Sequence, residues 1–321
     1  MLGSNESIQL LSEHAEQIFG DGTFKYAPKH YKQMYTIHIH KDNIYVPVIY
    51  FLLKNKQTKT YKTMFSMLKE KCSVLNIETA FFDFEIAAHN AFRNVFPGVA
   101  VRGCRFHLAQ AWYRKLASLG FQDTYLKATS GTAIWLKTCF GLPCLPASEV
   151  TEYFVTELCK SAPHSPAIQS FIAYTRKTYI KPNSTFLPEM CAGCLDGSGQ
   201  NTTNGCENFH RHFGTGCLTP HLNIYDWLAH RSLHHKRQLT RSNGSHLPSK
   251  KSSALHKYLQ SIYFKYRTNE IDAMTFVKLC SLNCLPTSRI IGKTRSKSVV
   301  STIKKKYKKI VKDILKKKQP L

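Results

Sequence analysis

Hydrophobic and polar positions along the first part of the chain follow the two-residue period of β-strands. Short apolar runs predict strands at 19–25, 34–40 and 44–53. The residues Lys41-Asp42-Asn43 separate the last two runs and have the composition of a hairpin turn. The chain is therefore expected to open with three antiparallel strands.

The next segments alternate between helical and extended patterns. Apolar residues from Tyr61 to Cys72 recur on one helical face, and the same spacing predicts helices over 88–95 and 108–119. Strands are predicted at 79–82 and 99–104. Three strands followed by helix, strand, helix, strand and helix is the order of a ribonuclease H-like mixed sheet. The sequence therefore predicts an α/β fold in which helices flank this sheet.

The remainder of the chain is predicted to be largely helical. Amphipathic stretches broken by prolines follow residue 120, and a polar loop ends them before the helix that carries Glu207. We expect the first part of the ribonuclease H-like core at 1–120 and an all-helical insertion at 121–200. The return to the core, with a helical C-terminal part, is expected at 201–283, and a basic tail at 284–321.

The net charge of the chain indicates the kind of partner that it binds. The chain has 45 Lys and Arg against 20 Asp and Glu, and residues 208–321 contain 24 of these bases and four acids. Such an excess indicates a polyanion, so we expect DNA as the partner and a nuclear location. The longest apolar run, 46–53, is too short to cross a bilayer, so no membrane role is expected. The bases expected to contact phosphates are Lys304, Lys305, Lys306, Lys308 and Lys309.

Three acids in distinct patterns provide candidate chemistry. Asp21 lies in GDGTFKYAP, Asp83 in FFDFEIAAHNAFRNVFPG and Glu207 in TTNGCENFHRHF. The first two come at the ends of predicted strands, and the third comes in the first turn of a predicted helix. Converging carboxylates can hold two Mg²⁺ or Mn²⁺ ions and support phosphodiester chemistry. We therefore expect Asp21, Asp83 and Glu207 to be catalytic metal ligands if the chain is an active enzyme.

Each acid also has a purely structural interpretation. Asp21-Gly22 is a common turn pair. Asp83 could be the N-cap of the following helix. Asn204 with Glu207 three residues later resembles a capping box. The joint pattern, rather than any single acid, favours catalysis.

A second group of residues could bind metal or support the carboxylates. Cys104-x-x-His107 comes between a strand and a helix, and His210 follows the third acid by three residues. Cys191-x-x-Cys194 could complete a zinc site with this pair. We instead expect Cys104, His107 and His210 to pack and hydrogen-bond beside the carboxylates, and we do not expect zinc.

These segments together resemble the transposase core of Mutator-like elements, the MULE domain. The similarity runs from about Ile8 to Gly216 and is carried by the three quoted segments and by the apolar hairpin containing VPVIYFLL. The resemblance implies a ribonuclease H-like DDE transposase with a helical insertion before its last acid, acting on DNA with divalent metal. Asp21, Asp83 and Glu207 match the family's catalytic acids. Cys104 and His107 match its Cys-x-x-His motif.

Two departures from this family leave other functions open. A zinc-binding DNA-recognition module commonly precedes such a core, yet Asp21 comes only twenty residues into the chain. The segment MCAGCLDG replaces an aromatic-rich stretch, which makes Asp196 an alternative third acid, although His210 favours Glu207. The alternatives to a transposase core are a domesticated, inactive nuclear DNA-binding protein and a ribonuclease H-like nuclease. Self-association is left open.

Overall fold

The computed structural model divides the chain into two compact units, each made of two separate stretches. The first unit contains Met1–Cys104 and Asn201–Ser249, and the second contains Arg105–Gln200 and Lys250–Leu321. The structure describes residues 1–72, 75–126, 130–193, 195, 203–215, 219–244, 250–284 and 309.

A five-stranded mixed sheet forms the centre of the first unit, in the order β3-β2-β1-β4-β5. The first three strands are antiparallel, whereas β4 and β5 run parallel to β1 and to each other. The strands are β1 (Gln17–Thr23), β2 (Gln33–Lys41), β3 (Ile44–Leu53), β4 (Thr79–Phe82) and β5 (Ala100–Gly103).

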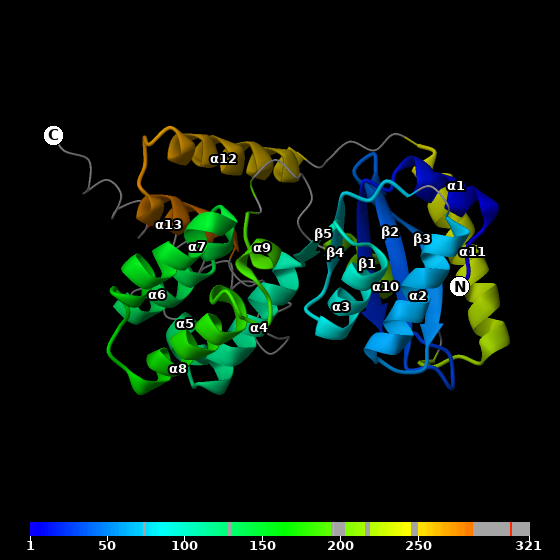
Figure 1. Ribbon diagram of the computed structural model, residues 1–321, viewed down its shortest axis with the longest axis horizontal. Coiled ribbons are helices and arrows are strands. Elements are labelled where there is room, and N and C mark those ends of the chain that lie inside the picture. The colour runs from blue at the N-terminus through cyan, green and yellow to red at the C-terminus, as the bar shows by residue number, and fades with distance from the viewer. Residues whose placement is uncertain are drawn as a thin grey trace. The chain divides into compact units, whose positions relative to one another are not determined.

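Helices cover both faces of this sheet (Figure 1). On one face, α2 and α3 bury Phe65 and Phe92 against Ile18 and Phe82 of the strands. On the other face, Cys206 of α10 packs on the rings of neighbouring strands. Alternation of side chains along each strand supplies these two apolar surfaces. The helices of this unit are α1 (Asn5–Glu13), α2 (Thr58–Lys71), α3 (Ile86–Val95), α10 (Asn204–Thr215) and α11 (Ile224–Ser242).

The β2–β3 hairpin confirms the predicted turn. Asp42 and Asn43 both have positive φ, at 48° and 65°, the conformation of a two-residue type I′ turn. Asn and Asp are the side chains that tolerate this conformation best after glycine. At the outer edge of β3, Leu2 forms an antiparallel bridge with Tyr50.

The described secondary-structure elements of the second unit are all helices, joined by turns and loops. Its core contains Trp112, which is buried against the rings of Phe140, Phe171 and Tyr179. Its elements are α4 (Arg105–Ser118), α5 (Gln122–Leu126), α6 (Gly131–Cys139), η1 (Leu142–Cys144), α7 (Ala147–Tyr153), η2 (Phe154–Cys159), α8 (Pro166–Thr175), η3 (Arg176–Ile180), α9 (Pro188–Cys191), α12 (Lys250–Arg267) and α13 (Ala273–Cys284). Across the described parts of both units, no helix combines the length and the apolar character needed to cross a membrane.

The sequence predicted the core elements well and their ends less well. The strand at 79–82 is confirmed at its predicted bounds, whereas β1 begins two residues before the predicted 19–25. Helix α1 was not predicted at all. It buries only Ser7, Leu10 and Leu11, which is too few apolar residues to give a clear helical period.

Candidate functional site

Asp21 lies inside β1 and is paired with Thr36 of β2. The interpretation of Asp21-Gly22 as a turn is therefore wrong. Strand alternation puts the Asp21 side chain on the same face as Phe19, the face that α10 covers. The side chain is only 5% exposed, and its Oδ1 accepts a hydrogen bond of 2.9 Å from the Gly22 amide.

Asp83 follows the last residue of β4 and belongs to the same face. Strand β4 is parallel to β1 with Phe19 opposite Phe81, so continuing this register by two residues places Asp83 opposite Asp21. Asp83 and Asp21 both lie near enough to Tyr35 to affect its ionisation. Burial is the main cause that raises the pKa of Tyr35 well above its usual value, and the charges of Asp83 and Asp21 add to it.

Asp83 is held at its backbone rather than as a helix cap. The N-cap of α3 is Glu85, so the N-cap interpretation of Asp83 is wrong. His89 Nε2 donates to the Asp83 carbonyl at 2.5 Å, and burial lowers the pKa of His89 to about 4, so this imidazole is neutral near pH 7. These contacts fix the chain where it leaves the sheet.

Glu85, the nearby acid in the same segment, is engaged elsewhere. Its Oε2 lies 2.7 Å from Lys56 Nζ, and its Oε1 accepts a 2.9 Å hydrogen bond from the Tyr61 hydroxyl. Gln33 in turn donates to the Tyr61 hydroxyl. Glu85 is thus held by Lys56 and Tyr61, whereas the register of β1 and β4, continued by two residues, places Asp83 opposite Asp21.

Glu207 reaches this region on α10, which packs on β1 and β3. The preceding residue, Cys206, is fully buried between the sheet and the helix. Burial raises the pKa of its thiol well above the usual value, and Asp21, Cys104 and Glu207 contribute to the shift. The structure therefore brings Glu207 and Asp21 to the same neighbourhood, and the register of β1 and β4 adds Asp83.

His210 connects α10 to Asp21. Its Nδ1 lies 3.2 Å from Asp21 Oδ2, and its Nε2 lies 2.8 Å from the Thr36 hydroxyl. An ionised carboxylate can only accept, so Nδ1 donates to Asp21. His210 therefore contacts Asp21 and Thr36 together, and its role in supporting a catalytic site stays a prediction.

Thr36 and His38 complete this network, and neither was predicted from the sequence. His38 Nε2 lies 2.8 Å from the Thr36 hydroxyl, and both side chains are fully buried. Burial, with His210 as a second cause, lowers the pKa of His38 well below its usual value. The available signal was the alternation Thr36-x-His38, which places two polar side chains on one face of an apolar strand.

Cys104 ties the start of α10 to the sheet. Its amide continues the β4–β5 ladder by donating to Phe82 O at 2.8 Å, and its sulfur accepts a 3.3 Å hydrogen bond from the Thr203 amide. Cys104 is fully buried at this point, and its role beside a catalytic site stays a prediction. His107 lies in the first turn of α4, which belongs to the second unit.

The described candidates for zinc ligands are divided between the units, with Cys104 in the first and His107 and Cys191 in the second. Cys191 ends α9 in the second unit, and burial raises its pKa strongly. Cys194 and the alternative acid Asp196 lie outside the described residues, as do Lys304, Lys305, Lys306 and Lys308. Lys309 is described and is exposed.

The chemistry of the three carboxylates fits a hard divalent cation, because Mg²⁺ and Mn²⁺ prefer oxygen ligands. Among the residues that the structure describes, Asp21 Oδ1 and Oδ2 each have one partner. A carboxylate oxygen carries two lone pairs, so both oxygens retain capacity for a cation. Among the described residues, no group of three or more His, Cys, Asp or Glu side chains already has the arrangement of a metal site. The roles of Asp21, Asp83 and Glu207 as metal ligands therefore stay a prediction.

Comparison with known proteins identifies part of the chain. A search of curated proteins finds no match. The family model of the MULE transposase domain matches residues 18–111, less than a third of the chain. The matched segment runs from β1 into α4 and includes Asp21, Asp83 and the Cys104-x-x-His107 motif, but it ends before Glu207. The resemblance to the MULE domain is thus confirmed over 18–111, and the match indicates a transposase-like function.

Proposed function

We propose that the chain is the core of a Mutator-like DDE transposase with a ribonuclease H-like fold, which binds DNA and catalyses metal-dependent strand cleavage and transfer. The observation that supports it most directly is the parallel register of β1 and β4, which brings Asp21 opposite Asp83 when it is continued by two residues, within the segment that matches the MULE domain. The strand order and the antiparallel opening hairpin support the same fold.

Asp21, Asp83 and Glu207 would hold divalent metal at the face of the sheet that α10 covers. Bound there, Mg²⁺ or Mn²⁺ supplies an activated water or 3′-hydroxyl and stabilises the leaving oxygen of a phosphodiester. The chain's own residues supply position. His210 holds the Asp21 carboxylate from α10, and Cys104 anchors the start of that helix. Because Thr36 is buried between two imidazoles, the network around Asp21 restricts its motion.

The test is nicking of supercoiled DNA in Mn²⁺ by the full chain and by Asp83→Asn and Glu207→Gln variants. These near-isosteric changes remove a negative charge from the metal ligands, so we expect nicking to fall at least about a hundredfold while DNA binding in EDTA changes little. Glu70→Gln is the matched control, because Glu70 is exposed on α2 and should nick normally.

Joining of the cut DNA to a target would favour a transposase, and hydrolysis of an RNA-containing duplex alone would favour a ribonuclease H-like nuclease. Loss of both nicking and DNA binding in Asp83→Asn, together with lower thermal stability, would show instead that Asp83 holds the fold.

A domesticated, inactive DNA-binding protein is the second candidate function. The contacts of Asp21 with His210 and the Gly22 amide favour it, because they give the carboxylate a structural role without metal. DNA binding with no nicking by the unaltered chain, in either Mg²⁺ or Mn²⁺, would establish this alternative.

A further inference from the structure

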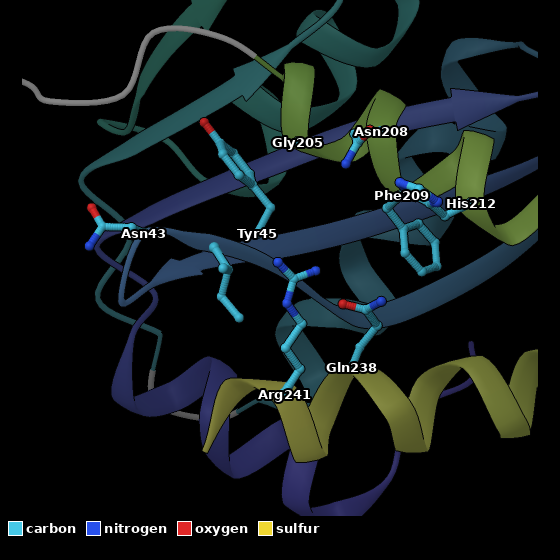
Figure 2. A pocket seen from close by; sticks show the side chains of 9 residues that line it. Asn43, Tyr45, Gly205, Asn208, Phe209, His212, Gln238 and Arg241 are labelled. Atoms are coloured by element: carbon cyan, nitrogen blue, oxygen red, sulfur yellow. The ribbon is translucent and has the colours of Figure 1, made fainter. Parts of the chain in front are cut away.

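A polar pocket lies between α10, the β2–β3 hairpin and the C-terminal part of α11. Its cavity volume is about 160 Å³. Figure 2 shows Asn208 and His212 on α10, Gln238 and Arg241 on α11, and Asn43 at the hairpin turn. The other lining residues are Ile44, Tyr45, Gly205 and Phe209. All nine belong to the first unit.

The side chains in this pocket suit an anion. Arg241 supplies a guanidinium, and Asn43, Asn208 and Gln238 supply amide groups that can donate hydrogen bonds. No carboxylate is among the nine lining residues. Arg241 is exposed and reaches from α11 toward the hairpin (Figure 2). A guanidinium with neighbouring donors is the arrangement that recognises phosphate oxygens.

The pocket lies across α10 from the candidate carboxylate site. At about 100° per residue, Asn208 and His212 fall between about 100° and 160° around the helix from Glu207 and His210. The outward surface between these two flanks carries Arg211, whose guanidinium donates to Asn208 Oδ1 at 2.5 Å. A helix is about 10 Å across, so one nucleic-acid strand can reach both flanks. The intervening surface is basic rather than acidic.

We propose that this pocket binds a backbone phosphate of the DNA strand whose scissile bond lies at Asp21, Asp83 and Glu207. The assignment rests on the proposed function, because it takes DNA as the substrate. Arg241 contacts the phosphate directly, and Asn208 and Gln238 hold its oxygens. Arg211 lies under the strand where it crosses α10.

The test is DNA binding in EDTA, measured at several salt concentrations with a short duplex and a single strand of the same sequence. We expect Arg241→Gln to weaken binding about tenfold, because a hydrogen bond to a charged group is lost. The slope of log K against log salt should fall by about 0.9 for a duplex, the value for one phosphate contact. Asn208→Asp should weaken binding at least as much, since it places a negative charge in the pocket while keeping the acceptor for Arg211.

Two variants control for general charge effects. Lys236→Gln removes a positive charge from the same helix, but Lys236 is exposed and lies about 140° around α11 from Arg241. Asn90→Asp adds the same negative charge on an exposed position of α3, which packs on the opposite face of the sheet. Both should bind DNA within about twofold of the unaltered chain, because neither removes or opposes a specific phosphate contact.

Unfolding measurements separate ligand binding from structure. Arg241 lies in the last turn of α11, where a cation also stabilises the helix end, so some loss of stability is expected from Arg241→Gln alone. Weaker DNA binding by Arg241→Gln, with α10 and α11 still folded, supports the phosphate contact. If Arg241→Gln and Lys236→Gln change the salt slope equally, the proposal is overturned.

A parallel titration with inorganic phosphate distinguishes a DNA phosphate from a free anion. Loss of inorganic phosphate binding in Arg241→Gln, with DNA binding unchanged, would mark a free-anion site and overturn the DNA assignment. Failure of the unaltered chain to bind any DNA would overturn the proposed function and this assignment together. If the unaltered chain binds DNA and Arg241→Gln binds it equally tightly, only the assignment of the pocket is overturned.

Discussion

Asp21 is a strand residue that packs in the fold and is also a proposed metal ligand. Its side chain points to the face covered by α10, where His210 contacts it and Thr36 supports His210. The sequence could predict Asp21 as a candidate acid because the pattern that marks it, GDGTFKYAP, lies in one short continuous segment. It could not predict Thr36 and His38 as neighbours of His210, because that contact joins residues 174 positions apart.

Gly205 is required by the close packing of α10 on the hairpin. A Cβ at this position would lie 2.0 Å from the Tyr45 ring and 2.7 Å from the Tyr45 Cβ, which the strand backbone holds in place. Rotation of the ring alone therefore cannot make room. We expect Gly205→Ala to destabilise the first unit by about 1 to 3 kcal/mol, the usual cost of overpacking, and to lower both nicking and DNA binding.

The matched control for this change is Gly131→Ala at the start of α6. A Cβ at Gly131 meets no atom within 4 Å, so the variant should be neutral or more stable by up to about 1 kcal/mol. Denaturant unfolding of both variants measures the difference. Equal stability of Gly205→Ala and the unaltered chain would show that α10 can shift away from Tyr45.

Helix α1 is held by polar contacts in addition to the burial of Leu10 and Leu11 in the core. The Ser4 side chain caps it by accepting from the Ser7 amide, and the buried Ser7 hydroxyl lies 2.7 Å from His235 Nε2 of α11. The capping residues are visible in the sequence, but the partner on α11 comes 228 positions later. Local pattern alone therefore left this helix unpredicted.

Docking of α11 should make the first unit sensitive to acid. Burial, with Arg231 as a second cause, lowers the pKa of His235 to about 4, below its ordinary value of 6.5. The folded state thus binds fewer protons than the unfolded state between these values, and its stability falls as the pH falls through this window. Between pH 7 and pH 5 the loss from His235 is about 2 kcal/mol.

Hydrogen exchange of the β2 and β3 amides at pH 7 and pH 5 can measure this loss in the first unit, after correction for the intrinsic exchange rate. His38 and His89 also have lowered pKa values, so the unaltered chain should lose more than the contribution of His235. His235→Gln removes one titrating group and should show the smaller decrease. An identical pH dependence in both proteins would mean that His235 keeps its proton affinity on folding.

Over the whole molecule, the sequence was most informative where contacts are local. The order of strands and helices from β1 to α4 followed from periodicity, and the antiparallel hairpin followed from its turn residues. The partition of the chain was less accessible. Helices α10 and α11 belong to the unit that contains the sheet, while α12 and α13 belong to the unit of helices that begins at Arg105. Both pairs are amphipathic helices in sequence, and helical period does not specify which core a helix joins.

The distribution of charge leads to a prediction for the full chain. Residues 285–321 contain 13 Lys and Arg and one Asp, about half of the net charge of +25. If these bases contact phosphates, removing residues 285–321 should lower the salt slope of DNA binding by several units, at about 0.9 per contact. Nicking at low salt should persist, because the three carboxylates lie in the first unit.

The effect of Arg241→Gln on the slope should also persist in the truncated chain, since pocket and tail contact different phosphates. An unchanged slope after truncation would place the main DNA-binding surface on the folded units, and disappearance of the Arg241 effect would show that the two contacts depend on each other.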